Sequence, residues 1–210
     1  MFPRPLFFVG ALLWMATVGA GFASLARYNN TPGALGEQAP SRWPSLSHLG
    51  RTAGLPTLVV MLHPRCPCSR ATLANLERAM PELRDKARVH LVFVRPDAED
   101  GRDDNALLRI ARNMRGTEIF ADETGREAGL FGTLTSGETL LYSPEGALVF
   151  HGGITFGRSH EGVNPGLSAI VQFIHHDSAN RSSTSVFGCA LTQAPKHQQP
   201  QPSQRVPSND

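Results

Sequence analysis

The residues of this sequence most able to do chemistry are two cysteines separated by a single residue. Cys66 and Cys68 flank Pro67, directly after an unbroken apolar run from Leu58 to Leu62 and directly before a helical pattern. The run is too short to span a membrane and does not alternate, so it predicts a central strand buried on both faces. The thiols therefore follow the carboxyl end of a strand, where sites form in open α/β sheets.

Thiol chemistry at this corner requires a stabilised thiolate. The start of a helix stabilises a thiolate, because its unpaired N–H groups and its dipole favour negative charge. Arg65 and Arg70 add positive charge nearby, and His63 can add charge when protonated or accept the proton. We predict that Cys66, which lies farther from the helix body, attacks and that Cys68 resolves the mixed disulfide.

A structural disulfide or a pair of inert thiols is the alternative interpretation of these two cysteines. A bridge that closes so small a loop constrains the unfolded chain little. A strained, exposed bridge is also easily reduced. The spacing therefore favours a labile redox pair over a structural bridge.

The remaining apolar pattern places the thiol corner in an α/β domain. A helical pattern follows the thiols, a second apolar strand follows that helix, and two short strands are joined by a turn that contains Pro and Gly. Two strands joined through a helix predict a right-handed parallel βαβ unit. The predicted elements are strands over 58–62, 89–94, 139–142 and 147–150, a helix over 69–87 and a closing helix from Asn164.

This order, with a Cys-Pro-Cys corner between strand and helix, resembles the thioredoxin-like superfamily. The resemblance implies a mixed central sheet, made of the βαβ unit and the C-terminal hairpin, with flanking helices. Cys68 after Pro67 matches the second cysteine of the family's motif, whereas Arg65 stands at the position of the first. The order of attack between Cys66 and Cys68 therefore stays open on the resemblance alone.

Family members usually carry a cis-proline just before the hairpin, facing the thiols. Here that position falls on Gly137, preceded by Thr135 and Ser136. A glycine still lets a partner backbone approach closely.

The wider pattern, from the apolar N-terminus through CPCSRATL to a late VFGC, resembles the bacterial membrane-anchored, thioredoxin-like proteins called RedB. That resemblance implies a thiol–disulfide oxidoreductase that acts on protein thiols or disulfides. Cys189, in the VFGC stretch, has three open interpretations. It is a tail cysteine without a role, a third redox thiol brought back to the corner by its apolar neighbours, or a site of intermolecular pairing.

Residues Pro5 to Ala26 carry no charge and would form a helix of about 33 Å, enough to cross a bilayer core. A cleaved signal peptide is the alternative, although its apolar region is typically about 7–15 residues. Either interpretation sends the domain out of the cytoplasm, and we expect a bacterial inner-membrane protein facing the periplasm. The predicted parts are an anchor or signal peptide over 1–26, a flexible tether over 27–54, a thioredoxin-like domain over 55–177 and a largely disordered tail over 178–210.

Copper binding is the competing function. Two close thiolates with a later histidine resemble the copper site of Sco-type chaperones, which share the thioredoxin fold, and Cu(I) prefers soft thiolates. The ligands would be Cys66, Cys68 and His160, but Sco-like proteins place three residues between the cysteines and this sequence places one. A binding module that keeps the fold without catalysis is a further alternative. We expect no cofactor for the oxidoreductase, and a net charge of +2 with no basic stripe argues against nucleic acid.

Overall fold

The chain forms a five-stranded mixed sheet with helices on both faces, seen in a computed structural model that describes residues 4–36, 39–95 and 106–191. The strand order is β3-β2-β1-β4-β5. β1 pairs in parallel with β2, and β2 with β3, while β4 runs antiparallel to β1 and β5 antiparallel to β4. The strands are β1 (Thr57–Leu62), β2 (Arg88–Val94), β3 (Thr117–Asp122), β4 (Glu138–Tyr142) and β5 (Leu148–Gly153). The predicted fold is confirmed.

The unbroken apolar run at 58–62 reflects burial of β1 on both sides, as predicted. Leu58, Val60 and Leu62 join the core beneath α2 (Pro67–Leu83), α3 (Ala106–Asn113) and α5 (Pro165–His176). Val59 and Met61 point the other way, into a second core that includes a residue of α4 (Arg126–Leu130). Side chains alternate across a strand, so a strand covered on both faces needs apolar residues at every position.

Helix α2 begins two residues before the start that the pattern predicted. Pro67 occupies its first turn, where a missing N–H costs nothing because no intrahelical partner exists there. Pro81 lies inside the final turn, and the helix ends at Leu83. Cys68 is therefore held within the first turn of a helix, and Cys66 is its N-cap.

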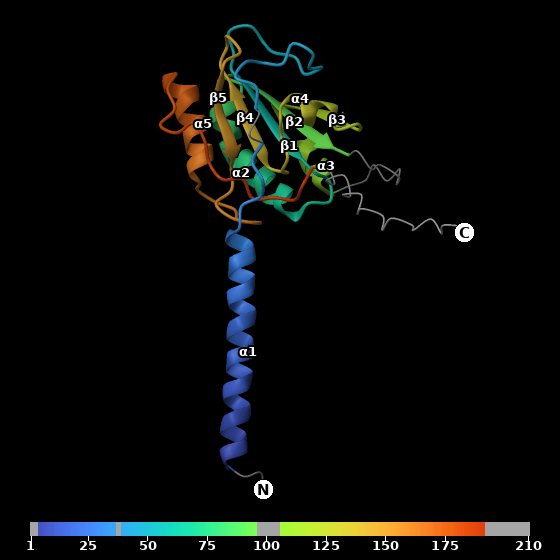
Figure 1. The fold of residues 1–210 in the computed structure, drawn as a ribbon. Coiled ribbons are helices and arrows are strands. Elements are labelled where there is room, and N and C mark those ends of the chain that lie inside the picture. The colour runs from blue at the N-terminus through green and yellow to red at the C-terminus, as the bar shows by residue number, and fades with distance from the viewer. Residues whose placement is uncertain (1–3, 37–38, 96–105, 192–210) are drawn as a thin grey trace, which may run out of the picture.

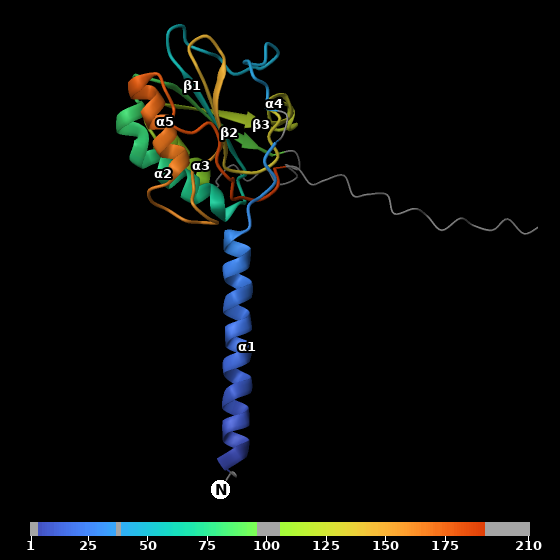
Figure 2. The same cartoon turned by 60° about the vertical axis from the view of Figure 1, so that its left-hand side comes forward.

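Helix α1 (Arg4–Asn30) projects from the domain as a separate stalk (Figures 1 and 2). Its stretch Phe8–Asn30 is long and apolar enough to cross a membrane, and none of its most apolar window is buried within the protein. An apolar stretch exposed in this way is suited to an apolar environment outside the protein.

Part of the segment predicted as a flexible tether contacts the domain. Trp43 packs edge-on against Phe131 and Tyr142, with ring centroids 5.1 and 5.2 Å away. Its backbone N–H donates to the Gly146 carbonyl at 2.8 Å, and Leu49 is buried. These contacts place residues between 43 and 49 on the sheet, while the boundaries at 26/27 and 54/55 stay predictions.

Part of the predicted tail contacts the domain. Residues 178–191 run along the domain, with single bridges that pair Ser183 with His151 and Ala190 with Thr135. Val186 and Leu191, from the apolar island in this segment, are buried. Residues 192–210 lie outside the described residues.

The packing of Trp43 predicts a stability effect that a free tether would not show. Trp43→Ala should lower the free energy of unfolding by about 2 kcal/mol, less than for a fully buried tryptophan, because its contacts with two rings are lost. Chemical denaturation of the full chain would measure this. Leu46→Ala, at a side chain 67% exposed in the same segment, is the matched control and should change stability by less than about 0.5 kcal/mol. Equal effects of the two variants would contradict the packed arrangement.

Candidate active site

The thiol corner is built by a tight turn between β1 and α2. The backbone N–H of Cys66 donates to the His63 carbonyl at 3.0 Å, and the Ser69 N–H donates to the Cys66 carbonyl at 3.0 Å. Cys66 has an extended backbone, while Pro67 starts the helix. The two cysteines thus sit on either side of the point where extended chain becomes helix, at the helix end that favours negative charge.

Two buried serines fasten this corner to the loop before β4. The hydroxyls of Ser69 and Ser136 lie 2.6 Å apart. The His63 N–H donates to both, at 3.3 and 3.0 Å. These contacts of Ser69 and Ser136 could not be predicted from the sequence, because a contact over 67 residues leaves no local signal.

The predicted cis-proline position is occupied by Gly137, which adopts a left-handed backbone with φ of +94°. Its N–H donates to the Met61 carbonyl at 2.7 Å. A Cβ at this position would meet the Thr72 hydroxyl at 3.1 Å and would also strain the backbone. Gly137 therefore serves the close joining of β1, α2 and the loop before β4.

The tail segment 186–191 lies against this same loop. The Ser136 N–H donates to the Cys189 carbonyl at 2.8 Å, and the Leu191 N–H donates to the Leu134 carbonyl at 2.9 Å. A Cβ on Gly188 would clash with the Ser136 carbonyl, so only glycine permits this approach. The tail is paired there like a short antiparallel strand.

This pairing brings Cys189 to the thiol corner. The sulfur of Cys189 lies 2.9 Å from that of Cys66, and the sulfur of Cys68 lies 3.8 Å from the Ser159 hydroxyl. Cys66 is only 1% exposed, so the sulfur that we predicted to attack is covered. Of the three interpretations of Cys189, the geometry is that of a thiol brought back to the corner.

Hydrogen bonds between the sulfurs give the three thiols different pKa values. The thiol of Cys68 donates to Cys66 and lowers the pKa of Cys66 to about 4, with further help from Cys189 and the Ser69 N–H and against the effect of burial. The same bond to Cys66, together with burial, raises the pKa of Cys68. Burial and the neighbouring Cys66 raise the pKa of Cys189 to about 11. The corner thus favours one thiolate, on Cys66, held by two protonated thiols.

The predicted supporting side chains lie in and around the turn between β1 and α2. The ring Nδ1 of His63 accepts a hydrogen bond from the Arg65 N–H at 3.2 Å, so this ring nitrogen bonds within the turn between β1 and α2. Arg65, Pro67 and Arg70 are exposed, and the lowered pKa of Cys66 has hydrogen bonds as its causes. Their supporting role stays a prediction. A residue that the sequence analysis missed, Arg158, donates to the Gly188 carbonyl at 2.7 Å and so holds the tail at the thiols.

The copper alternative lacks a ligand set in the part of the chain that the structure describes, because no group of three His, Cys, Asp or Glu side chains there is arranged to hold a metal. The His160 ring lies 6.1 Å from the ring of Phe156, and its carbonyl accepts a bond from Asn75. His160 is thus not brought into one ligand group with Cys66 and Cys68.

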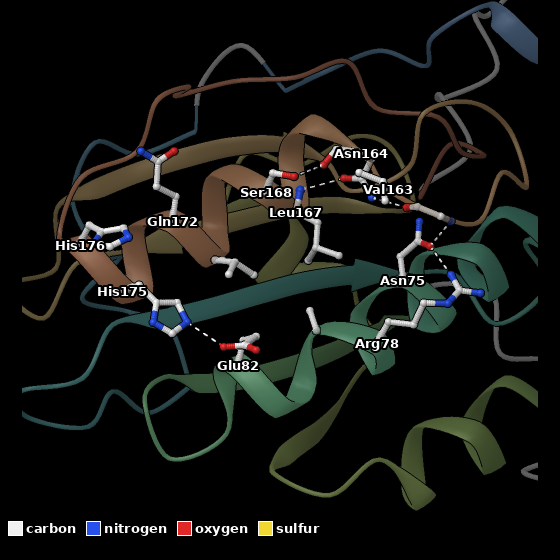
Figure 3. Close-up of a pocket in the computed structure, with 13 residues that line it drawn as sticks. Asn75, Arg78, Glu82, Val163, Asn164, Leu167, Ser168, Gln172, His175 and His176 are labelled. Carbon is white, nitrogen blue, oxygen red and sulfur yellow. Dashed lines mark hydrogen bonds and ion pairs between the residues drawn. The ribbon is translucent and has the colours of Figure 1, made fainter.

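A separate groove of about 550 Å³ lies between α2 and α5 (Figure 3). Its lining includes the ion pair of His175 with Glu82, 2.8 Å apart, and Arg78 bonded to Asn75 at 2.8 Å. None of the three cysteines lines this groove. It is distinct from the thiol corner.

The sheet order and the thiols at the β1–α2 corner define a thioredoxin-like fold. No family model matches the sequence, and no curated protein is similar to it in sequence. An uncharacterized conserved protein from Geobacillus kaustophilus has a similar structure, with a TM-score of 0.55 at 16% identity over 80% of this chain and 95% of that chain. A hypothetical protein from Sinorhizobium meliloti gives 0.52 at 16% identity, over 66% and 79%.

The pneumococcal exposed lipoprotein thioredoxin Etrx1 from Streptococcus pneumoniae is a more distant structural match. Its TM-score is 0.40 at 16% identity, over 58% of this chain and 84% of that chain. At such identities the similarity of the Geobacillus and Sinorhizobium proteins shows the fold alone.

The hydrogen bond from Cys68 predicts how the ionisation of Cys66 responds to substitution. In the reduced wild-type protein the carbon-13 shift of Cys66 Cβ should titrate with a midpoint of about 4, so the thiolate persists above that pH. Cys68→Ala removes the main donor and should raise the pKa of Cys66. Cys189→Ala removes a lesser donor and should raise this pKa by less. A wild-type midpoint at the ordinary cysteine value of about 8.5 would contradict the arrangement.

Proposed function

We propose that this chain is a membrane-anchored, extracytoplasmic thiol–disulfide oxidoreductase whose attacking sulfur is Cys66. The observation that carries the proposal is the contact of the Cys66 and Cys189 sulfurs, 2.9 Å apart, with Cys68 in the adjoining first turn of α2. Disulfide exchange requires a thiolate to attack and a second thiol to resolve the product. This corner supplies both.

In the direction that reduces a partner, the Cys66 thiolate attacks one sulfur of the partner's disulfide. A bond forms between Cys66 and that sulfur, and the partner's other sulfur leaves as a thiolate that takes up a proton. Cys68 then loses its proton and attacks the Cys66 sulfur, which releases the partner's remaining sulfur as a second thiolate. The partner gains two electrons and the chain is left with a Cys66–Cys68 disulfide, while oxidation of a partner runs the same steps in reverse.

Cys189 is the candidate third redox thiol in this scheme. With its sulfur 2.9 Å from Cys66, it is positioned to attack a mixed disulfide on Cys66 and form a Cys66–Cys189 disulfide instead. It also covers Cys66, so a protein partner must displace segment 186–191 before its own sulfur can take the place of Cys189.

The location and partners follow from α1 and from the chemistry. The most apolar window of α1 is not buried in the protein and favours an uncleaved anchor, with the domain in the periplasm and protein thiols or disulfides as partners. The RedB proteins, which share this order of anchor, Cys-Pro-Cys corner and late cysteine, are the specific group that we propose for the chain. No cofactor is needed for exchange between sulfurs.

Equilibration of the full chain with a glutathione series tests this function. We expect one two-electron transition between dithiol and disulfide, read by thiol alkylation and mass spectrometry, and its loss in Cys66→Ser. Peptide mapping then distinguishes the Cys66–Cys68 disulfide from Cys66–Cys189. His160→Ala is the matched control and should leave the transition unchanged, because His160 has no role in sulfur attack.

Two results would count against the proposal. Free thiols on Cys66 and Cys68 in strongly oxidising glutathione, without a mixed disulfide, would exclude exchange. Tight 1:1 binding of Cu(I) to the reduced chain that is lost in His160→Ala would favour the copper function instead.

A further inference from the structure

The connection between β5 and α5 is attached directly to the last turn of α1. The Arg158 N–H donates to the Asn29 carbonyl at 3.1 Å, and the Arg158 guanidinium lies over the Tyr28 ring, 4.7 Å from its centroid. Both views show this connection, in orange, beside the upper end of the helix (Figures 1 and 2). The domain therefore lies directly against the end of α1.

The length of α1 sets the depth of these contacts if it spans a membrane, as the proposed function assumes. The uncharged part, up to Ala26, covers about 33 Å, close to the bilayer core of about 30 Å. Asn29 follows Ala26 by about 4.5 Å along the axis, and each headgroup layer is about 5–8 Å thick. Asn29 and Tyr28, with the Arg158 that contacts them, then lie within the headgroup layer.

The surface around this helix end exposes an aromatic ring and a cation. A hollow of about 370 Å³ is bounded by Asn30, Phe156, Arg181 and Phe187, among others. Phe156 is 63% exposed, and Arg181 is also exposed. Aromatic rings and cations are the side chains that favour the level of the headgroups. We propose that this face, formed by residues 155–158 and 181–187, rests in the headgroup layer of the bilayer.

The thiol corner lies at the same end of the domain. Ser159, whose hydroxyl is 3.8 Å from the Cys68 sulfur, directly follows Arg158. Arg158 also holds Gly188, the neighbour of Cys189. The proposed orientation therefore directs the thiols to cysteines that a partner presents at the membrane surface, which deepens the proposed function by naming the class of partner.

Photo-cross-linking of the full chain in vesicles of phosphatidylethanolamine and phosphatidylglycerol tests the orientation. The photoreactive residue p-benzoylphenylalanine would replace Phe156, Leu46 or Phe22, one at a time, and mass spectrometry would detect lipid adducts. Leu46 is the matched control, since it is 67% exposed and belongs to the segment at the far end of the domain from α1 (Figure 1). Phe22 lies within α1 and reports on the anchor itself.

Lipid adducts at positions 156 and 22, at least about tenfold above position 46, are the expected result, since cross-links form only at contact distance. Adducts at position 22 alone would overturn the orientation and leave the anchor standing. Adducts at neither position would overturn both the anchor and the orientation. Equal adducts at 156 and 46 would also overturn the orientation, because the domain would then have no preferred face.

Lifting the domain from the membrane tests the class of partner. A helical insertion of seven residues after Asn30 would raise the domain by about 10 Å. Exchange with a disulfide peptide carried on a lipid anchor should fall by about tenfold, because the effective concentration of the two sites falls. Exchange with the same peptide free in solution should change less than about twofold, which shows that the chemistry is intact. An unchanged rate with the lipid-anchored peptide would contradict a partner at the membrane surface.

Discussion

The close approach of three sulfurs, with those of Cys66 and Cys189 2.9 Å apart, is the arrangement on which the site depends. A sulfur that is 1% exposed should resist ionisation, because burial disfavours the charged form. Donation from Cys68 and Cys189 outweighs this burial and lowers the pKa of Cys66. Because both donors are themselves thiols, the groups that stabilise the thiolate are also the groups able to resolve its disulfide.

The rest of the fold holds these three sulfurs together. β1 and α2 position Cys66 and Cys68, while the Ser69–Ser136 contact ties their turn to the loop before β4. That loop in turn pairs with the tail that carries Cys189. In the proposed mechanism this cover has a consequence, since a partner would reach Cys66 after the tail segment leaves its place. Segment 186–191 is held in place by backbone pairing over only a few residues and by the burial of Val186 and Leu191.

The fold was predictable because its signals are local. The apolar run of β1, the helical spacing in α2 and the turn of the hairpin each follow from a few consecutive residues, and the right-handed βαβ rule joins them. The site was predictable only in part. Cys66 and Cys68 lie one residue apart in the sequence. The contacts of Ser136, Ser159 and Arg158 with the corner, by contrast, join residues far apart in the chain. The tail was hard to predict for another reason. Polar residues surround its short apolar stretch, and the burial of that stretch depends on residues far away in the chain.

Trapping a mixed disulfide tests most directly that Cys66 is the attacking sulfur. A full-length variant with both Cys68→Ala and Cys189→Ala leaves Cys66 with no thiol to resolve an adduct, so a partner peptide should stay bound to it. Peptide mapping of the trapped complex of this variant should place the partner's sulfur on Cys66. The companion variant that keeps only Cys68 should trap the same peptide at least about tenfold more slowly, because Cys66 at the N-cap of α2 keeps the bond from the Ser69 N–H, whereas burial still raises the pKa of Cys68. Faster trapping on Cys68 than on Cys66 would contradict the account.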